Sequence, residues 1–246
     1  MCIAKEMKSW SGRMQQSIYG ESHFDYLVYL PKEYDGTKKY PLVFFLHGAG
    51  ERGSDLELLK KIAVPKIFER DLDYPGVVVS PQCRIDRTWT SQAEKIYDFL
   101  QWIIKKYNID EDAISITGIS MGGFGTWQVL LDHPHVFSAA APICCGTMSA
   151  LTYLLTHLPI RIYHGEKDEL VDCFYSKDVY KRLKAYGAKD VELFLYPECR
   201  HDSWTQAYER TDLLEWLISK RRAKVESLPQ ERDRAEFLQR LLTKKN

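Results

Sequence analysis

Short apolar runs alternate with longer amphipathic stretches along the chain from Phe24 onward. Several runs are apolar at nearly every position, which is typical of parallel strands that are covered by helices on both faces. The predicted strands are residues 24–30, 42–47, 77–80, 113–118, 138–142, 160–164 and 191–196. Strands that alternate with helices in this way predict a doubly wound α/β sheet.

Helical periodicity is clearest in residues 92–107. Its apolar positions recur three or four residues apart, as one face of a helix requires: Ile96, Phe99, Leu100, Ile103, Ile104 and Tyr107. Further helices are predicted over residues 124–131, 174–186 and 203–219. Residues 56–68 also have helical character, and we expect them to roof one side of any site beside them.

The composition is that of an ordinary globular protein, with 45% hydrophobic residues among 246. The 34 basic and 34 acidic residues cancel, so net charge does not favour nucleic acid or a membrane surface as a partner. No apolar run approaches the roughly 20 residues of a membrane span, and the first twenty residues lack the apolar core of a secretory signal. We therefore expect a cytoplasmic protein that binds neither membranes nor nucleic acid.

Six cysteines are dispersed through the chain without metal-ligand spacing, which predicts free thiols and no bound metal. Residues 1–219 are expected to form a single domain. The composition changes at residue 220, because residues 220–246 carry nine basic and four acidic side chains. Leu238, Leu241 and Leu242 form a possible stripe on a short helix that would dock on the body or on another subunit. The alternative is a solvated extension, and the oligomeric state stays open.

The sequence Gly118-Ile119-Ser120-Met121-Gly122 follows a predicted strand and precedes a predicted helix. This G-x-S-x-G pattern in that context predicts a nucleophile elbow, a tight turn that holds the serine hydroxyl above the carboxyl edge of the sheet. Ser120 is therefore the candidate nucleophile. A negative charge that develops there is favoured by the N-terminus of the following helix.

A second glycine-rich segment, residues 47–53, follows the strand 42–47. A serine acyl-transfer enzyme needs two backbone N–H donors for the oxyanion, one after the nucleophile and one from such a loop. Met121 and Ala49 are the candidate donors. His47 is expected to be a packed residue that shapes the loop, because the histidine base comes last in this type of fold.

The serine also needs a histidine base, and the base needs a carboxylate that fixes its tautomer. The expected order is serine, acid, histidine, each at the end of a later strand. Asp168 follows the strand 160–164 and His201 follows the strand 191–196, so these are the candidate acid and base. Asp172 is a rival acid that is better placed to cap a helix, and Glu166 is too close to the strand end. The other histidines are expected to lie away from the serine or to pack in turns: His23, His133, His135, His157 and His164.

Together these segments resemble the α/β-hydrolase superfamily, and more narrowly its esterase branch. This branch includes phospholipase/carboxylesterase, feruloyl-esterase-like and dienelactone-hydrolase-like proteins, which are often labelled predicted peptidases. The matching stretches are residues 46–53, 107–110, 117–123, 137–144, 164–168 with Val171, and 201–204. The resemblance spans about residues 24–219. Asp172 departs from the pattern, since the family commonly has proline there.

The resemblance implies a serine hydrolase that cleaves a small-molecule carboxylic ester through an acyl-enzyme on Ser120, with no cofactor. Only a short segment separates the strands 138–142 and 160–164, so no large cap is expected, and the open site favours short-chain or bulky soluble esters. Four candidate substrate-binding residues lie beside the motifs: Trp89, Trp204, Glu51 and Arg52. The alternatives are a prolyl-oligopeptidase-like peptidase and a hydrolase-fold binding protein without catalysis.

Overall fold

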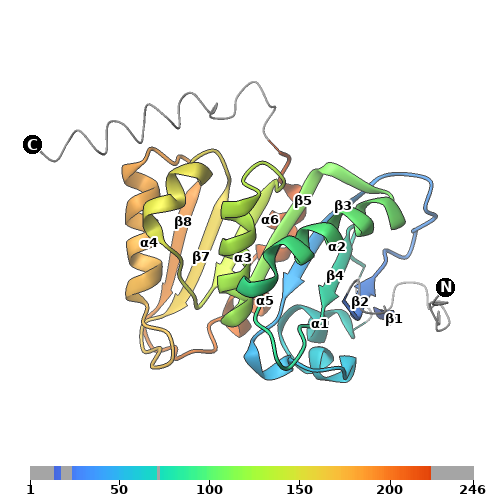
Figure 1. The fold of residues 1–246 in the computed structure, drawn as a ribbon, viewed down its shortest axis with the longest axis horizontal. Coiled ribbons are helices and arrows are strands. Elements are labelled where there is room, and N and C mark those ends of the chain that lie inside the picture. Colours follow the sequence, from blue (N-terminus) through green and yellow to red (C-terminus); the bar gives the residue numbers. More distant parts are fainter. Residues whose placement is uncertain (1–13, 18–23, 71–72, 223–246) are drawn as a thin grey trace, which may run out of the picture.

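The computed structural model describes residues 14–17, 24–70 and 73–222, which form one eight-stranded sheet (Figure 1). The strand order is β1-β2-β4-β3-β5-β6-β7-β8. β1 and β2 pair antiparallel, β2 runs antiparallel to β4, and all further neighbours are parallel. The strands are β1 (Met14–Ser17), β2 (Tyr26–Tyr29), β3 (Tyr40–Leu46), β4 (Val77–Pro81), β5 (Ile109–Ile119), β6 (Ala139–Ile143), β7 (Ile160–Gly165) and β8 (Val191–Tyr196).

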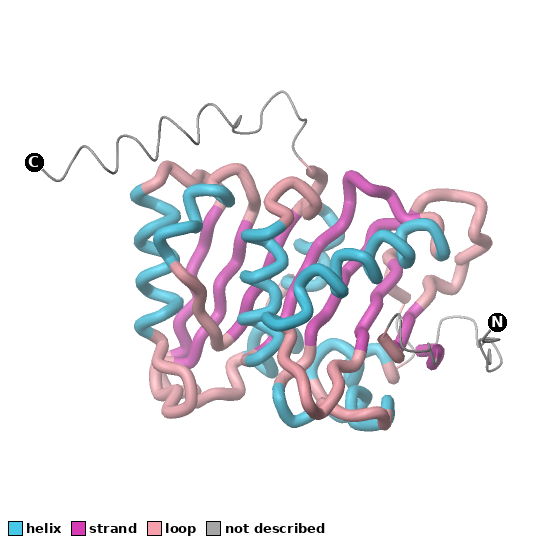
Figure 2. The backbone as a smooth tube through the Cα atoms, in the orientation of Figure 1, coloured by secondary structure: helices cyan, strands magenta, loops and turns pink. Residues whose placement is uncertain are grey.

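Helices cover both faces of this sheet (Figures 1 and 2). One layer consists of α2 (Ala93–Lys106), α3 (Met121–Asp132) and α4 (Phe174–Ala185). The other consists of α1 (Ala63–Phe68), α5 (Trp204–Arg210) and α6 (Leu213–Ser219). Short 3-10 helices lie in the loops: η1 (Ala49–Glu51), η2 (Leu56–Lys61), η3 (Thr90–Gln92) and η4 (Ser149–Leu155).

The two helical layers explain why the central strands are apolar on successive residues. In β3, Leu42, Phe44 and Leu46 pack into the core under α2 and α3. Val43 and Phe45 point to the other face and pack with α1, α5 and α6. Successive side chains of a strand point to opposite faces, so a strand covered on both sides needs apolar residues throughout. The predicted doubly wound α/β architecture is confirmed.

All seven predicted strands are present, with small shifts of their ends. The four residues of β1 were not predicted. The predicted helix over residues 203–219 is two helices, because Thr211 has an extended backbone and its Oγ1 accepts a hydrogen bond from the N–H of Leu213 (3.2 Å). The helical stretch 56–68 divides in the same way into η2 and α1.

The loops that follow the parallel strands meet at one edge of the sheet, the lower edge in Figure 1. Between β6 and β7 the chain forms only the short helix η4, so the described part of the chain has no large cap over this edge. None of the helices in the described ranges has the length and apolarity that crossing a membrane requires. The leucine stripe at positions 238–242 lies outside the described residues.

Candidate active site

Ser120 lies in a sharp turn between β5 and α3. Its backbone has φ 52° and ψ −118°, a conformation that a residue with a side chain rarely adopts. Gly122 allows the turn to sit against β3, since a Cβ there would lie 2.0 Å from the carbonyl oxygen of Leu46. The N–H of Ser120 donates to the carbonyl of Ile143 at the end of β6 (3.0 Å). The strand–turn–helix context predicted for the elbow is therefore present.

The loop after β3 brings a second helix start close to this turn. Ala49 begins η1 and Met121 begins α3, and the first N–H groups of a helix have no acceptor within it. The close approach of Gly122 to the carbonyl of Leu46 brings the N-termini of α3 and η1 near one another. The N–H groups of Ala49 and Met121 therefore stay the expected donors of an oxyanion site.

His47 fixes the shape of this loop and has no free nitrogen for catalysis. The backbone N–H of Cys83 donates to Nε2 (2.9 Å), so Nε2 is an acceptor, and Nδ1–H donates to the carbonyl of Gly48 (2.6 Å). Burial lowers the pKa of His47 to about 4, so the imidazole is neutral at physiological pH. Its placement agrees with the expected packing role.

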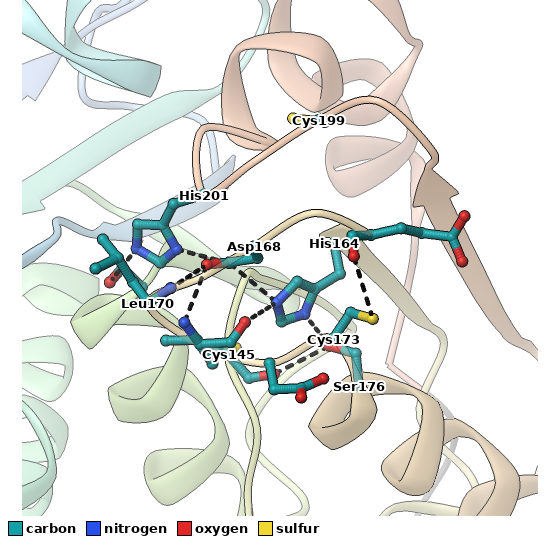
Figure 3. A network of polar contacts seen from close by, with 12 residues as sticks. Cys145, His164, Asp168, Leu170, Cys173, Ser176, Cys199 and His201 are labelled. Carbon is teal, nitrogen blue, oxygen red and sulfur yellow. Dashed lines mark hydrogen bonds and ion pairs between the residues drawn. The ribbon is translucent and has the colours of Figure 1, made fainter.

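Ser120, His201 and Asp168 form a hydrogen-bonded row. His201 Nε2 lies 2.8 Å from Ser120 Oγ. His201 Nδ1 lies 2.7 Å from Asp168 Oδ2, and Figure 3 shows these two side chains facing each other. Since a carboxylate only accepts, Nδ1 carries the proton and Nε2 accepts from the serine hydroxyl. The structure thus brings together the three residues that the sequence selected from three separate loops.

The carboxylate of Asp168 is held by the backbone of its own loop as well. Its Oδ1 accepts from the N–H groups of Leu170 (2.9 Å) and Val171 (3.0 Å). Burial raises the pKa of Asp168, but the hydrogen bonds from Val171, His201 and Leu170 outweigh it, so the net pKa is below the usual range. The side chain is fully buried and ionised at neutral pH. It can therefore orient the imidazole of His201 and stabilise its protonated form.

The loops that carry the acid and the base pack directly on each other at Gly165. A Cβ there would meet the carbonyl oxygens of Arg200 (2.1 Å) and Cys199 (2.4 Å). The N–H of Lys167 also donates to the carbonyl of Cys199 (2.9 Å). This backbone contact explains why the last residue of β7 is glycine. The absence of a side chain lets the loop that carries His201 approach the loop that carries Asp168.

The rival acids have other partners. Asp172 Oδ1 accepts from the N–H of Phe174 (2.8 Å), the first residue of α4, although the N-cap position itself is Cys173. Glu166 forms an exposed ion pair with Lys177. Of the other histidines, His133 stacks on Tyr97, His135 and His157 contact each other, and His23 lies outside the described residues.

Trp89 does not wall a substrate pocket, which corrects the expectation from sequence. Its side chain is fully buried, and Nε1 donates to the carbonyl of His47 (2.9 Å). Trp89 therefore stabilises the glycine-rich loop of residues 47–53. Arg52 also has a structural role, because its guanidinium donates to the carbonyls of Ala49, Ile85 and Arg87 and connects two loops.

Trp204 and Glu51 lie beside the site. The ring of Trp204 stands edge-on to His201, with centroids 5.5 Å apart. Glu51 is half-buried beside Gly48, and burial raises the pKa of its carboxyl group. Both side chains therefore adjoin the segments that carry the base and the glycine-rich loop, and they stay the expected substrate contacts.

Two features at this edge of the sheet were not predicted from the sequence. His164, expected to be a packed turn residue, contacts the acid Asp168 with its Nε2 (3.2 Å). Four large apolar side chains are exposed after β6 and β7: Met148 after β6, Leu170 in the loop of Asp168, and Phe174 and Tyr175 at the start of α4. Their only sequence signal is their position just after predicted strands of the carboxyl edge.

Comparison with known proteins agrees with this geometry. The sequence profile of the Esterase family, described as "Putative esterase", matches residues 19–234. The chain belongs to the Esterase family. No curated protein sequence matches this chain.

Solved structures share the fold of the esterase. A thermostable esterase has 30% sequence identity, a TM-score of 0.70 and coverage of 81% of the chain, which spans 60% of that protein's length. A mutant feruloyl esterase module from Clostridium thermocellum in complex with sinapinate has 17% identity and a TM-score of 0.69, with 85% and 88% of the two chains covered. Acylaminoacyl peptidase from Pyrococcus horikoshii has 16% identity and a TM-score of 0.61, with 91% and 43% covered. The latter two show the fold alone. The family match and the thermostable esterase place the chain in the Esterase family with the α/β-hydrolase fold.

Proposed function

We propose that this protein hydrolyses carboxylic esters through an acyl-enzyme on Ser120. The observation that carries the proposal is the row from Ser120 Oγ through His201 to Asp168, with contacts of 2.8 and 2.7 Å. His201 Nε2 takes the proton of the serine hydroxyl as Oγ attacks the ester carbonyl. The imidazolium that forms is stabilised by the buried carboxylate of Asp168.

The oxyanion of the tetrahedral intermediate would be bound by the N–H groups of Met121 and Ala49, the first residues of α3 and η1. His201 then returns its proton to the leaving alcohol. Water attacks the acyl-enzyme, with His201 as the base again, and the carboxylic acid is released. The reacting groups in these steps are those of the chain, the ester and one water molecule.

The exposed apolar side chains support a substrate with an apolar group on the β7 side of the row. Leu170, Phe174, Tyr175 and Met148 are 77%, 62%, 51% and 66% exposed. We call these four residues the apolar rim. Tyr175 lies over Gly146, just after β6, and Leu170 is two residues from Asp168. Exposed apolar patches of this kind mark binding surfaces. Since no large cap encloses the rim, short-chain or bulky soluble esters fit it better than long acyl chains.

A panel of esters tests the proposed reaction. It would comprise p-nitrophenyl esters from acetyl to long acyl chains, methyl ferulate and a proline-amide peptide. We expect ester cleavage, with kcat/KM highest for short or bulky acyl groups and falling for long chains. Cleavage of the amide but of no ester would replace the proposal with a peptidase, and no cleavage at all would favour a binding protein.

The apolar rim gives a separate prediction for substrate binding. Phe174→Ser removes an exposed ring at the start of α4 and should raise KM for an aromatic or bulky ester by roughly fivefold, as expected for about 1 kcal/mol of lost apolar contact. Acetyl ester cleavage should change little. Lys181→Ser, an exposed change later in the same helix, is the control. Equal KM values for all three proteins on the bulky ester would show that the rim does not contact substrate.

A further inference from the structure

His164 contacts the carboxylate of Asp168 from the side opposite His201. It lies at the end of β7, and its side chain is fully buried. Its Nε2 is 3.2 Å from Asp168 Oδ2, the oxygen that also accepts from His201 Nδ1 (Figure 3). The same Nε2 is 2.9 Å from the carbonyl oxygen of Val171. One carboxylate oxygen thus lies between two imidazole rings.

The surroundings of His164 determine which nitrogen carries the proton. Nε2 faces two oxygens that only accept, so it must donate. Nδ1 lies 2.7 Å from Ser176 Oγ on α4. Burial lowers the pKa of His164, so the ring is neutral and Nδ1 accepts from the Ser176 hydroxyl. The same hydroxyl is 3.0 Å from the carbonyl of Cys145, which is its alternative acceptor.

With His164 as a donor, all acceptor positions of the Asp168 carboxylate are used. Oδ1 accepts from the N–H groups of Leu170 and Val171, and Oδ2 accepts from His201 and His164. Four donors match the roughly four lone-pair sites of a carboxylate. Val171 contacts both residues, because its N–H donates to Asp168 Oδ1 and its carbonyl accepts from His164 Nε2. The carboxylate therefore has one orientation, with Oδ2 directed at His201.

We infer that His164 is a positioning residue for the acid of the triad, and that Ser176 holds it in the tautomer that donates to Asp168. The inference rests on the proposed function, because it assigns His164 an effect on the rate only through Asp168 and His201. Hydrogen-bond partners behind metal ligands fix the orientation of those ligands, and their loss typically costs about 10- to 100-fold in activity. We expect a loss of the same order for a partner of a catalytic carboxylate.

The first test compares two substitutions of His164. His164→Leu removes the donor, and we expect kcat for p-nitrophenyl acetate to fall about 10- to 100-fold, with KM within about twofold. The side-chain amide of His164→Gln can donate from a position near that of Nε2, and it should restore most of kcat. His157→Leu, which removes a half-buried histidine bound to the Pro134 carbonyl, should leave kcat unchanged.

The decisive test is whether the effects of His164→Leu and Asp168→Ala on kcat are non-additive. In an Asp168→Ala background, His164→Leu should cause no further fall in kcat, because the group that it positions is gone. A purely structural effect would lower kcat by the same factor in both backgrounds, and that result would overturn the inference. So would an unchanged kcat in His164→Leu.

Ser176→Ala keeps the inference testable if His164→Leu does not fold. Alanine is favourable within a helix, so α4 should form normally. Loss of the hydroxyl leaves Nδ1 without a donor and allows the other tautomer, so we expect kcat to fall severalfold without a change in KM. An unchanged kcat in Ser176→Ala would contradict the tautomer argument. If wild-type protein cleaves no ester, the proposed function fails, whereas an active wild type with insensitive variants refutes only the role of His164.

Discussion

Ser120→Ala is expected to lower kcat/KM for every ester by about 10⁴-fold or more, because the acyl-enzyme cannot form without the hydroxyl. The substitution removes only the side-chain oxygen that contacts His201 Nε2. Alanine carries the same Cβ as serine, so the turn at φ 52° bears no added strain and the fold should persist. The measurement is steady-state kinetics on p-nitrophenyl acetate, with unfolding curves as a check of stability.

Ser219→Ala is a matched control for this substitution. Ser219 ends α6, and its hydroxyl donates to the carbonyl of Trp216, so it should keep wild-type kcat/KM. Hydrolysis by Ser120→Ala at a rate near that of this control would mean that another group attacks the ester.

Asp168→Asn is expected to lower kcat/KM by about 10⁴-fold, as the loss of the acid does in other serine triads. The amide oxygen would remain at the position of Oδ1, where the N–H groups of Leu170 and Val171 need an acceptor. The amide nitrogen would then face His201 Nδ1 as a donor. This forces the proton of the ring onto Nε2, so that Nε2 can no longer accept the proton of Ser120.

The rival acid supplies the control for Asp168→Asn. Asp172→Asn should keep its activity, because the amide oxygen of asparagine can accept the hydrogen bond that Asp172 Oδ1 accepts from the N–H of Phe174. If kcat/KM fell more in Asp172→Asn than in Asp168→Asn, Asp172 would be the acid.

Much of the fold could be predicted because each central strand is apolar on both faces. Residues 191–196 were predicted as a strand and form β8 with the same limits. The strand Met14–Ser17 could not be predicted, because its four residues show no apolar alternation and it exists through antiparallel pairing with β2. The break at Thr211 was missed for a related reason: the apolar period continues across it.

The candidate site could be predicted where a motif prescribes backbone geometry. Gly118 to Gly122 mark the turn of Ser120, and the order of strands places Asp168 and His201 at the same edge. Contacts between loops carry no such signal. Whether Trp89 is a pocket wall or a buried support depends on the path of its loop. The contact of His164 with Asp168 likewise depends on how the loop after β7 folds back onto the strand end.

The most direct test of the central claim is labelling with a fluorophosphonate, in which the serine oxygen displaces fluoride and forms an adduct that water does not readily remove. Wild-type protein would be labelled to completion, digested and analysed by mass spectrometry. The account predicts one phosphonyl group per chain on the peptide containing Ser120, with loss of esterase activity in proportion to labelling, and no label in Ser120→Ala. Label on another residue, or full ester hydrolysis by protein that is completely labelled at Ser120, would contradict it.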